Sequence, residues 1–308
     1  MSQSFMFYRS EFGYSTYCAL LSHITANRYI FILITTLIIY TLLFLSLKDY
    51  VDNYPFAIII FMGFFFFFTF TYIRQVMGVV TAWFSVRYII RRKFVPFLIA
   101  IFIAYSFHNS AVIFLPLYFI PIRKFSVRTI AVVMGICLLI GMSPVPSSLF
   151  EIYGETNEAR LNAGGYAKDA GFRYEYLLEA IVCLGLILYY YSRIPKKTEH
   201  IVLLNIALVF CATLLIFIHS ENGGRLAWYY MIGLIATLTM IAVRKRKISY
   251  YSLSIVLLSF ILYSRILYAW GSLLSPYKTF LTDGVRQNDA VYEQYEYDHG
   301  YDADKLYR

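Results

Sequence analysis

Charged residues are scarce in this chain. Asp, Glu, Lys and Arg make up 15% of its 308 residues, whereas hydrophobic types make up 60%, and the mean hydropathy is +0.62. A typical soluble domain has about 25% charged residues. The composition therefore excludes an ordinary water-soluble protein and indicates a membrane protein.

The sequence also lacks the motifs of several common chemistries. Its four cysteines are too widely spaced to predict a disulfide framework or a metal site. It contains no Walker loop, dinucleotide fingerprint, zincin motif or nucleophile elbow. We interpret the one Asp-x-Asp match, Asp302-Ala-Asp304, as chance. We therefore expect no metal and no cofactor, and an ATPase or a protease has no support.

Long apolar segments, by contrast, occur from one end of the chain to the other. Each is long enough to cross a hydrocarbon core of about 30 Å as a helix. They cover residues 28–48, 55–73, 74–90, 94–121, 126–145, 174–192, 200–219, 225–243 and 248–270. These segments predict an all-α, polytopic integral membrane protein with about 8–9 transmembrane or re-entrant helices.

The net charge of +9 comes from short basic clusters between these segments. Such clusters mark cytoplasmic loops by the positive-inside rule, so they indicate topology rather than nucleic-acid binding. The clusters are "RRK" at 91–93, "RK" at 123–124 with Arg128, "KK" at 196–197 and "RKRK" at 244–247.

The polar segments then divide the chain into regions. We expect residues 1–27 to be an outer-facing N-terminal segment and residues 28–271 to form the membrane domain. Within that domain, 146–173 and 220–224 are outer-facing connections, and 272–308 is an acidic, tyrosine-rich tail. The N-terminus has no signal-peptide pattern, so we expect the first apolar segment to direct insertion.

Basic clusters at both ends of the 94–121 segment conflict with a single crossing. "RRKF" precedes it and "IRKFSVR" follows it, so one crossing would put a cluster on the wrong side. A re-entrant hairpin with "FHNS" at its bend removes the conflict, and Pro116 favours a break. The alternative is one long, tilted or kinked helix.

Three polar residues near the predicted outer ends of spans are candidate ligands for an anion. Arg74 and Gln75 follow the second apolar segment, and Arg225 opens the eighth. Converging guanidinium groups would indicate a phosphate or pyrophosphate ligand. Glu221 lies near Arg225 and could accept a proton. The alternative is that both arginines only snorkel to the interface or anchor it.

His108 is the candidate for proton transfer, because imidazole titrates near neutrality and can both donate and accept. Asn109 and Ser110 would position a polar ligand beside it. The alternative is a buried histidine that only ties the bend to its neighbours. Arg160 in the outer loop and Arg265 in the last span are weaker candidates for anion binding.

Four stretches resemble the EpsG-like family, the Wzy-type polymerases of bacterial surface polysaccharides. They are "SEFGYSTYCALLS", "RQVMGVVTAWFSVRYIIRRKFVPFLIAIFIAYSFHNSAVIFLPLYFI", "GGRLAWYYMIGL" and "SPYKTF". The last is similar to a closing Pro-Tyr-Lys motif and adds Tyr277 as a substrate-binding candidate. Family members usually carry another span before the Glu-x-Gly-Tyr segment, and this sequence begins almost on that segment.

The resemblance implies an enzyme of the bacterial inner membrane that joins oligosaccharide repeat units carried on undecaprenyl pyrophosphate. It implies no nucleotide cofactor, and it implies a flippase and a chain-length regulator as partners. Two other readings stay open: a lipid-linked oligosaccharide flippase, and an acyltransferase that modifies the same glycan. A transporter is expected to show paired halves with interrupted spans, and the absence of that pattern favours the enzyme.

Overall fold

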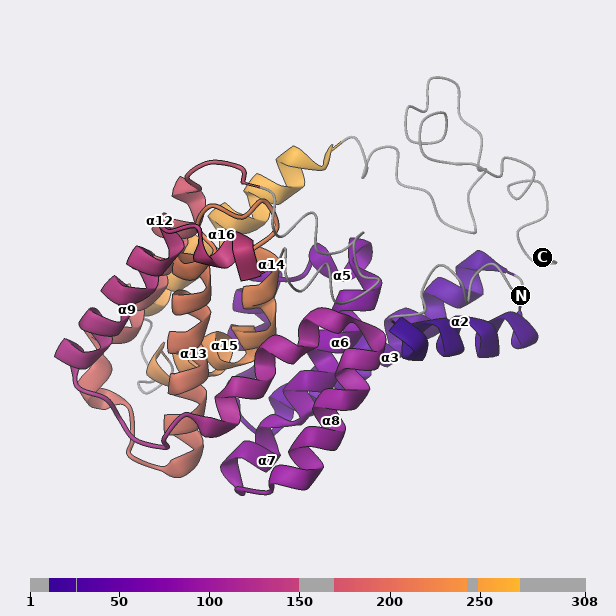
Figure 1. Ribbon diagram of the computed structural model, residues 1–308, viewed down its shortest axis with the longest axis horizontal. Coiled ribbons are helices and arrows are strands. Elements are labelled where there is room, and N and C mark those ends of the chain that lie inside the picture. Colours follow the sequence, from indigo (N-terminus) through magenta and orange to yellow (C-terminus); the bar gives the residue numbers. More distant parts are fainter. Residues whose placement is uncertain (1–10, 26, 150–168, 243–248, 272–308) are drawn as a thin grey trace.

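The computed structural model describes residues 11–25, 27–149, 169–242 and 249–271 (Figure 1). Within these ranges the chain is helical, and its only β-type pairing is one isolated bridge between Asp169 and Ser220. The all-α, polytopic fold predicted from the sequence is confirmed.

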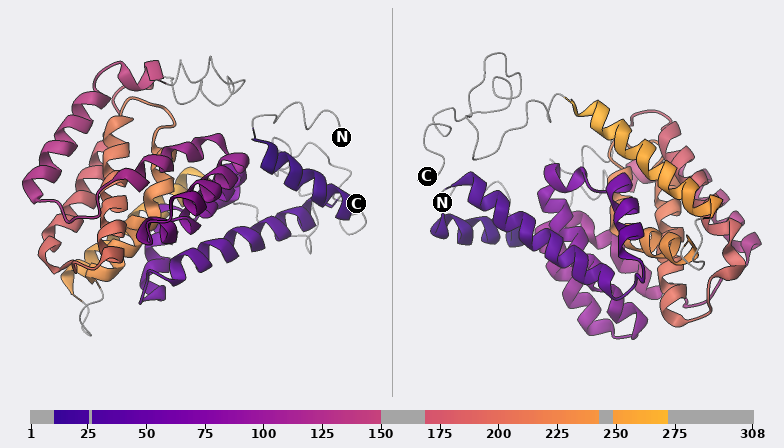
Figure 2. Two further views of the ribbon diagram at one scale, coloured as in Figure 1. Left: turned by 60° about the horizontal axis from the view of Figure 1, so that its bottom comes forward. Right: turned by 180° about the vertical axis from the view of Figure 1, so that it is seen from behind.

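Within the described residues, the first half of the chain folds into seven α-helices and one 3₁₀ helix. In chain order they are α2 (Phe12–Ile24), α3 (Arg28–Lys48), α4 (Tyr54–Phe64), α5 (Phe68–Thr71), α6 (Ile73–Phe84), α7 (Val86–Ile90), α8 (Phe94–Phe107) and the 3₁₀ helix η2 (Asn109–Phe119). Helices α3 and α8 flank α6, and α2 packs on α8. Figure 2 shows α2 beside α3 at one edge of the molecule, where the Tyr17 and Thr35 hydroxyls are 2.6 Å apart.

The second half is organised around helix α13 (Thr198–Ile216), which contacts most of its neighbours. Its elements are α9 (Val127–Gly141), α12 (Tyr174–Tyr189), η3 (Tyr191–Arg193), α13 (Thr198–Ile216), α14 (Gly224–Ala227), η4 (Trp228–Tyr230), α15 (Met231–Ala242) and α16 (Tyr250–Ala269). Helix α13 packs against α9, α12 and α15, while α16 packs on α4 (Figure 1). Gly233 lets α15 approach closely, because a Cβ there would lie 2.6 Å from the Ala207 backbone.

Four helical stretches are long and apolar enough to cross a membrane: 30–48, 198–216, 224–242 and 250–269. The first matches the predicted boundaries at 28–48 closely, since α3 spans Arg28–Lys48. Other predicted spans are shorter or broken. The 55–73 segment is interrupted after Phe64, and 74–90 is divided between α6 and α7 at Ser85.

The hairpin interpretation of 94–121 is confirmed, because the chain reverses. Helix α8 ends at Phe107, His108 is extended (φ −154°, ψ 124°), and η2 runs back along α8. The Phe94 and Tyr118 rings lie 4.9 Å apart, and Arg92 Nη1 donates to the Tyr118 carbonyl at 2.6 Å. Pro116 lies inside η2 rather than at the bend, so the reversal comes from the extended backbone of His108.

Candidate functional site

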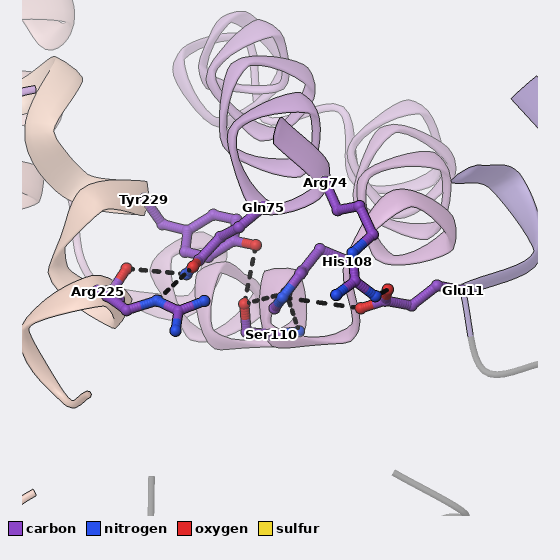
Figure 3. A network of polar contacts seen from close by, with 7 residues as sticks. All are labelled: Glu11, Arg74, Gln75, His108, Ser110, Arg225 and Tyr229. Carbon is purple, nitrogen blue, oxygen red and sulfur yellow. Dashed lines mark hydrogen bonds and ion pairs between the residues drawn. The ribbon is translucent and has the colours of Figure 1, made fainter. Parts of the chain in front are cut away.

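A cluster of polar side chains lies where the two halves of the chain meet (Figure 3). It includes Glu11, which precedes α2, and Arg74 and Gln75, which belong to the first turn of α6. The bend after α8 contributes His108 and Ser110, and the α14–η4 segment contributes Arg225 and Tyr229. The contacts described below join residues up to 150 positions apart in the sequence.

Glu11 forms the acidic part of this cluster. Its side chain is only 1% exposed, and its Oε2 accepts a hydrogen bond from Arg74 Nη1 at 2.6 Å. The other carboxylate oxygen lies 3.7 Å from His108 Nε2. Burial raises the pKa of the Glu11 carboxyl, while the charge and hydrogen bond of Arg74 oppose that shift. Glu11 therefore holds an arginine and a histidine on opposite oxygens.

The hydrogen bonds of His108 define the role of each ring nitrogen. The Ser110 backbone N–H donates to His108 Nδ1 at 3.3 Å, so Nδ1 is an acceptor and the neutral ring carries its proton on Nε2. The Ser110 hydroxyl also lies 2.7 Å from Nδ1 and 3.0 Å from the Tyr229 hydroxyl. A line of exchangeable protons therefore leads from Tyr229 through Ser110 to His108.

Arg225 is held by two kinds of contact. Its Nε donates to Gln75 Oε1 at 2.9 Å, and Gln75 Nε2 donates to the Arg225 carbonyl at 3.1 Å. Its guanidinium carbon lies 4.3 Å from the centre of the Tyr72 ring. Both arginines are near enough to act electrostatically on His108. Such pre-ordering suits a guanidinium that must bind an anion with little loss of entropy.

Two features show that this cluster is closely packed. A Cβ on Gly78 would lie 3.2 Å from the Tyr229 hydroxyl and 3.3 Å from His108 Cβ, so a residue without a side chain lets α6 approach both. The Trp83 indole donates to the Tyr229 carbonyl at 2.8 Å, which fixes η4 against α6.

Asn109 Nδ2 is buried and has no hydrogen-bond partner in the described part of the chain. That amide is a donor available to a ligand.

The structure thus brings together five of the residues singled out from the sequence: Arg74, Gln75, His108, Ser110 and Arg225. Sequence reasoning missed Glu11, Tyr72 and Tyr229. Glu11 carries a signal that could have found it, since it is the acidic residue of the Glu-x-Gly-Tyr segment.

The remaining candidates lie elsewhere. The Glu221 carbonyl accepts a hydrogen bond from the Tyr176 hydroxyl at 3.2 Å, and the role of its carboxylate as a base stays a prediction. Arg265 is 63% exposed and lies 3.7 Å from Glu175 on α12. Arg160, Tyr277 and the Asp302-Ala-Asp304 match fall outside the described residues. Within the described ranges, no three His, Cys, Asp or Glu side chains group to hold a metal ion.

Membrane-length helices, with a carboxylate, two arginines and a histidine gathered at helix ends, define a polytopic membrane protein with a polar site. A family model described as the EpsG family matches residues 2–279, and the chain belongs to that family. Membership links it to polysaccharide biosynthesis at a membrane. A comparison with curated proteins and another with solved structures found no match.

Proposed function

We propose that this protein is a glycosyltransferase of the Wzy type, which joins undecaprenyl-pyrophosphate-linked oligosaccharide repeat units into a surface polysaccharide at the outer face of the inner membrane. The observation that carries the proposal is a contact cluster in which Glu11 bridges Arg74 and the buried His108 while Gln75 holds Arg225 in the same cluster (Figure 3). This combination offers anion binding and proton transfer in one place, which are the two tasks of such a reaction.

In the reaction, an acceptor hydroxyl oxygen bonds to the anomeric carbon of the donor sugar. The bond between that carbon and the pyrophosphate oxygen breaks, and the lipid pyrophosphate leaves with the electron pair. Arg74 and Arg225 stabilise the charge that develops on the pyrophosphate. Because this donor brings its own leaving group, the reaction needs no nucleotide.

The acceptor proton moves to His108 Nδ1. That nitrogen is an acceptor in the structure, and the Ser110 hydroxyl 2.7 Å away is placed to pass the proton on. The imidazolium that forms is stabilised by Glu11, whose carboxylate oxygen faces Nε2. The unpartnered Asn109 amide donates to a sugar oxygen and so positions the acceptor.

Analysis of surface glycan in a strain without this gene tests the proposal. Loss of long chains with single repeat units retained supports a polymerase. Loss of all surface glycan would instead indicate a flippase, and chains of normal length without a substituent would indicate an acyltransferase. The purified protein in proteoliposomes, supplied only with lipid-linked repeat units, is expected to produce a ladder of longer glycans.

A further inference from the structure

A second polar site lies apart from the Figure 3 cluster, in a cavity of about 250 Å³. Three segments line it: the C-terminal end of α9 with residues 142–147, Asp169, and the residues that follow α13. The cavity is lined by a histidine, His219, that takes no part in the proposed reaction. It lies on the same connection after α13 that leads to Arg225.

His219 is paired with an acidic residue in a fixed arrangement. Its Nδ1 lies 3.5 Å from Asp169 Oδ1, and that oxygen also accepts the Gly171 N–H at 2.8 Å. The Ala170 N–H donates to the His219 carbonyl at 2.9 Å, within the β-bridge that joins Asp169 to Ser220. The Phe172 ring meets the imidazole edge-on, with the ring centres 5.7 Å apart. Main-chain pairing therefore holds the two side chains in register.

The other ring nitrogen of His219, Nε2, lacks a hydrogen-bond partner within the described residues, and it is buried. A buried polar atom without a partner destabilises the folded protein. A ring nitrogen of histidine either donates or accepts one hydrogen bond, and a hydroxyl group can meet either need.

The rest of the cavity indicates the class of ligand. Ser143 and Ser147 contribute hydroxyl groups, while Met142, Pro144 and Phe217 contribute apolar surface. A sugar ring combines both characters, since its hydroxyl groups form hydrogen bonds and its C–H faces pack on apolar side chains. Among the residues that the structure describes, neither Lys nor Arg lines the cavity, and the Asp169 carboxylate would repel a phosphate. The volume is below the range of about 300–1,000 Å³ for drug-sized ligands, so it suits one sugar residue.

The connection between this cavity and Arg225 is tightly packed. A Cβ on Gly223 would collide with Phe217 Cβ, and one on Gly224 would lie 2.8 Å from the Tyr176 ring. Phe217 also lines the cavity, and Gly224 immediately precedes Arg225. A ligand in the cavity would therefore be held at a fixed offset from the arginine.

We infer that the cavity around His219 and Asp169 is a saccharide subsite, which binds one uncharged sugar residue of the glycan while the Figure 3 cluster acts on the lipid-linked end. The inference rests on the proposed function for the identity of the glycan. The binding itself rests on the cavity, and it can be measured without any polymerisation.

The test uses the full-length protein in nanodiscs. The probe is a set of oligosaccharide fragments released by partial hydrolysis from the surface polysaccharide of the strain that carries this chain. We expect His219→Ala to weaken fragment binding at least tenfold and Ser147→Trp, which fills the cavity from another segment, to do the same. His200→Ala is the matched control, because His200 lies at the opposite end of α13. The affinity of this variant for the fragments is expected to stay within twofold of the wild-type value. Arg225→Ala is also expected to retain fragment binding.

Three results would overturn the inference: no binding of fragments to the wild-type protein, unchanged affinity in both His219→Ala and Ser147→Trp, or an equal loss in His200→Ala. The proposed function fails separately. If the protein binds fragments through His219 but never lengthens a glycan, the subsite is supported and the polymerase function is refuted. If the protein polymerises and His219→Ala binds fragments normally, the polymerase function is supported and the subsite is refuted.

Discussion

The basic residues at the two ends of the α8–η2 hairpin are held by different kinds of hydrogen-bond partner. At the His108 end, Arg74 and Arg225 are bound by the side chains of Glu11 and Gln75. At the other end, Arg92 donates to main-chain carbonyl groups at the C-terminal end of η2. Helix α8 has 14 residues, which separates the two ends by roughly 20 Å.

Other basic residues near the second end follow the same pattern as Arg92. Lys124 Nζ donates to the carbonyl groups of Tyr191 and Ile194 at 2.7 and 2.8 Å, and the Arg193 guanidinium lies 3.5 Å from the centre of the Tyr190 ring. Carbonyl groups and rings hold a cation without cancelling its charge, so these residues keep their positive charge, which agrees with the cytoplasmic side that the positive-inside rule predicts for them. The side-chain partners at the first end instead fix individual atoms, which is what the proposed reaction requires.

Replacement of His108 is expected to have the largest effect, because it removes the proton acceptor. His108→Gln keeps a hydrogen-bonding side chain of similar size but cannot take up a proton near pH 7. Polymerisation in proteoliposomes should fall about 10²–10⁴-fold, the usual contribution of general acid–base catalysis. His200→Gln, at the basic end, should leave the rate within about twofold. Full-length polymer from a normally accumulating His108→Gln protein would exclude His108 as the base.

A pair of arginine variants compares the two ends directly, since Arg225 and Arg193 both stack on a tyrosine. Lysine keeps the charge but loses the two-pronged geometry. Loss of one charge-assisted contact of about 1.5–3 kcal/mol predicts a decrease in rate of about 10–150-fold for Arg225→Lys. Arg193→Lys should be nearly silent. Equal rates for the two variants, measured at matched protein levels, would remove Arg225 from the site.

Two carboxylate variants extend the comparison to stability. Glu11 is 1% exposed, whereas Asp49, which lies 3.6 Å from Arg87, is 52% exposed. Glu11→Gln should lower the free energy of unfolding by about 1–3 kcal/mol, because it weakens buried charged contacts. Asp49→Asn should change it by about 0–1 kcal/mol, as exposed ion pairs do. Thermal unfolding in detergent measures both, and equal shifts would contradict a special role for Glu11.

The smallest effect on activity is expected from cysteine variants made for labelling. The labelling tests only which end of the molecule faces the cytoplasm. In a cysteine-free background, Ser148→Cys and Lys196→Cys place exposed thiols at opposite ends and should leave activity unchanged. A membrane-impermeant maleimide applied to whole cells should label Ser148→Cys only. Labelling of Lys196→Cys alone would reverse the proposed topology.

The sequence predicted the features that depend on local pattern and charge. Apolar length gave α3 its boundaries, and basic clusters on both sides of 94–121 gave the chain reversal at His108. The length of the apolar segment did not predict the division of 74–90 into α6 and α7, because a run of apolar residues does not reveal the break at Ser85.

Partners distant in sequence were beyond prediction. Glu11 and Arg74 are 63 positions apart, and Gln75 and Arg225 are 150 apart, so no periodicity connects them. The cavity at His219 was missed for the same reason, since its walls come from three separate segments. Each residue was visible in the sequence, but its neighbours were determined only by packing.

The position of the hairpin tip has a consequence for biogenesis. During synthesis, His108 and Ser110 leave the ribosome long before Tyr229, which is 119 residues after Ser110 and contacts its hydroxyl. The returning limb depends on the same late element, because the Tyr230 hydroxyl donates to the Ile113 carbonyl. Polar groups in hydrocarbon are costly until they find partners. The hairpin therefore forms its final contacts only after α14 and η4 have been synthesised. The site is among the last parts of the protein to assemble.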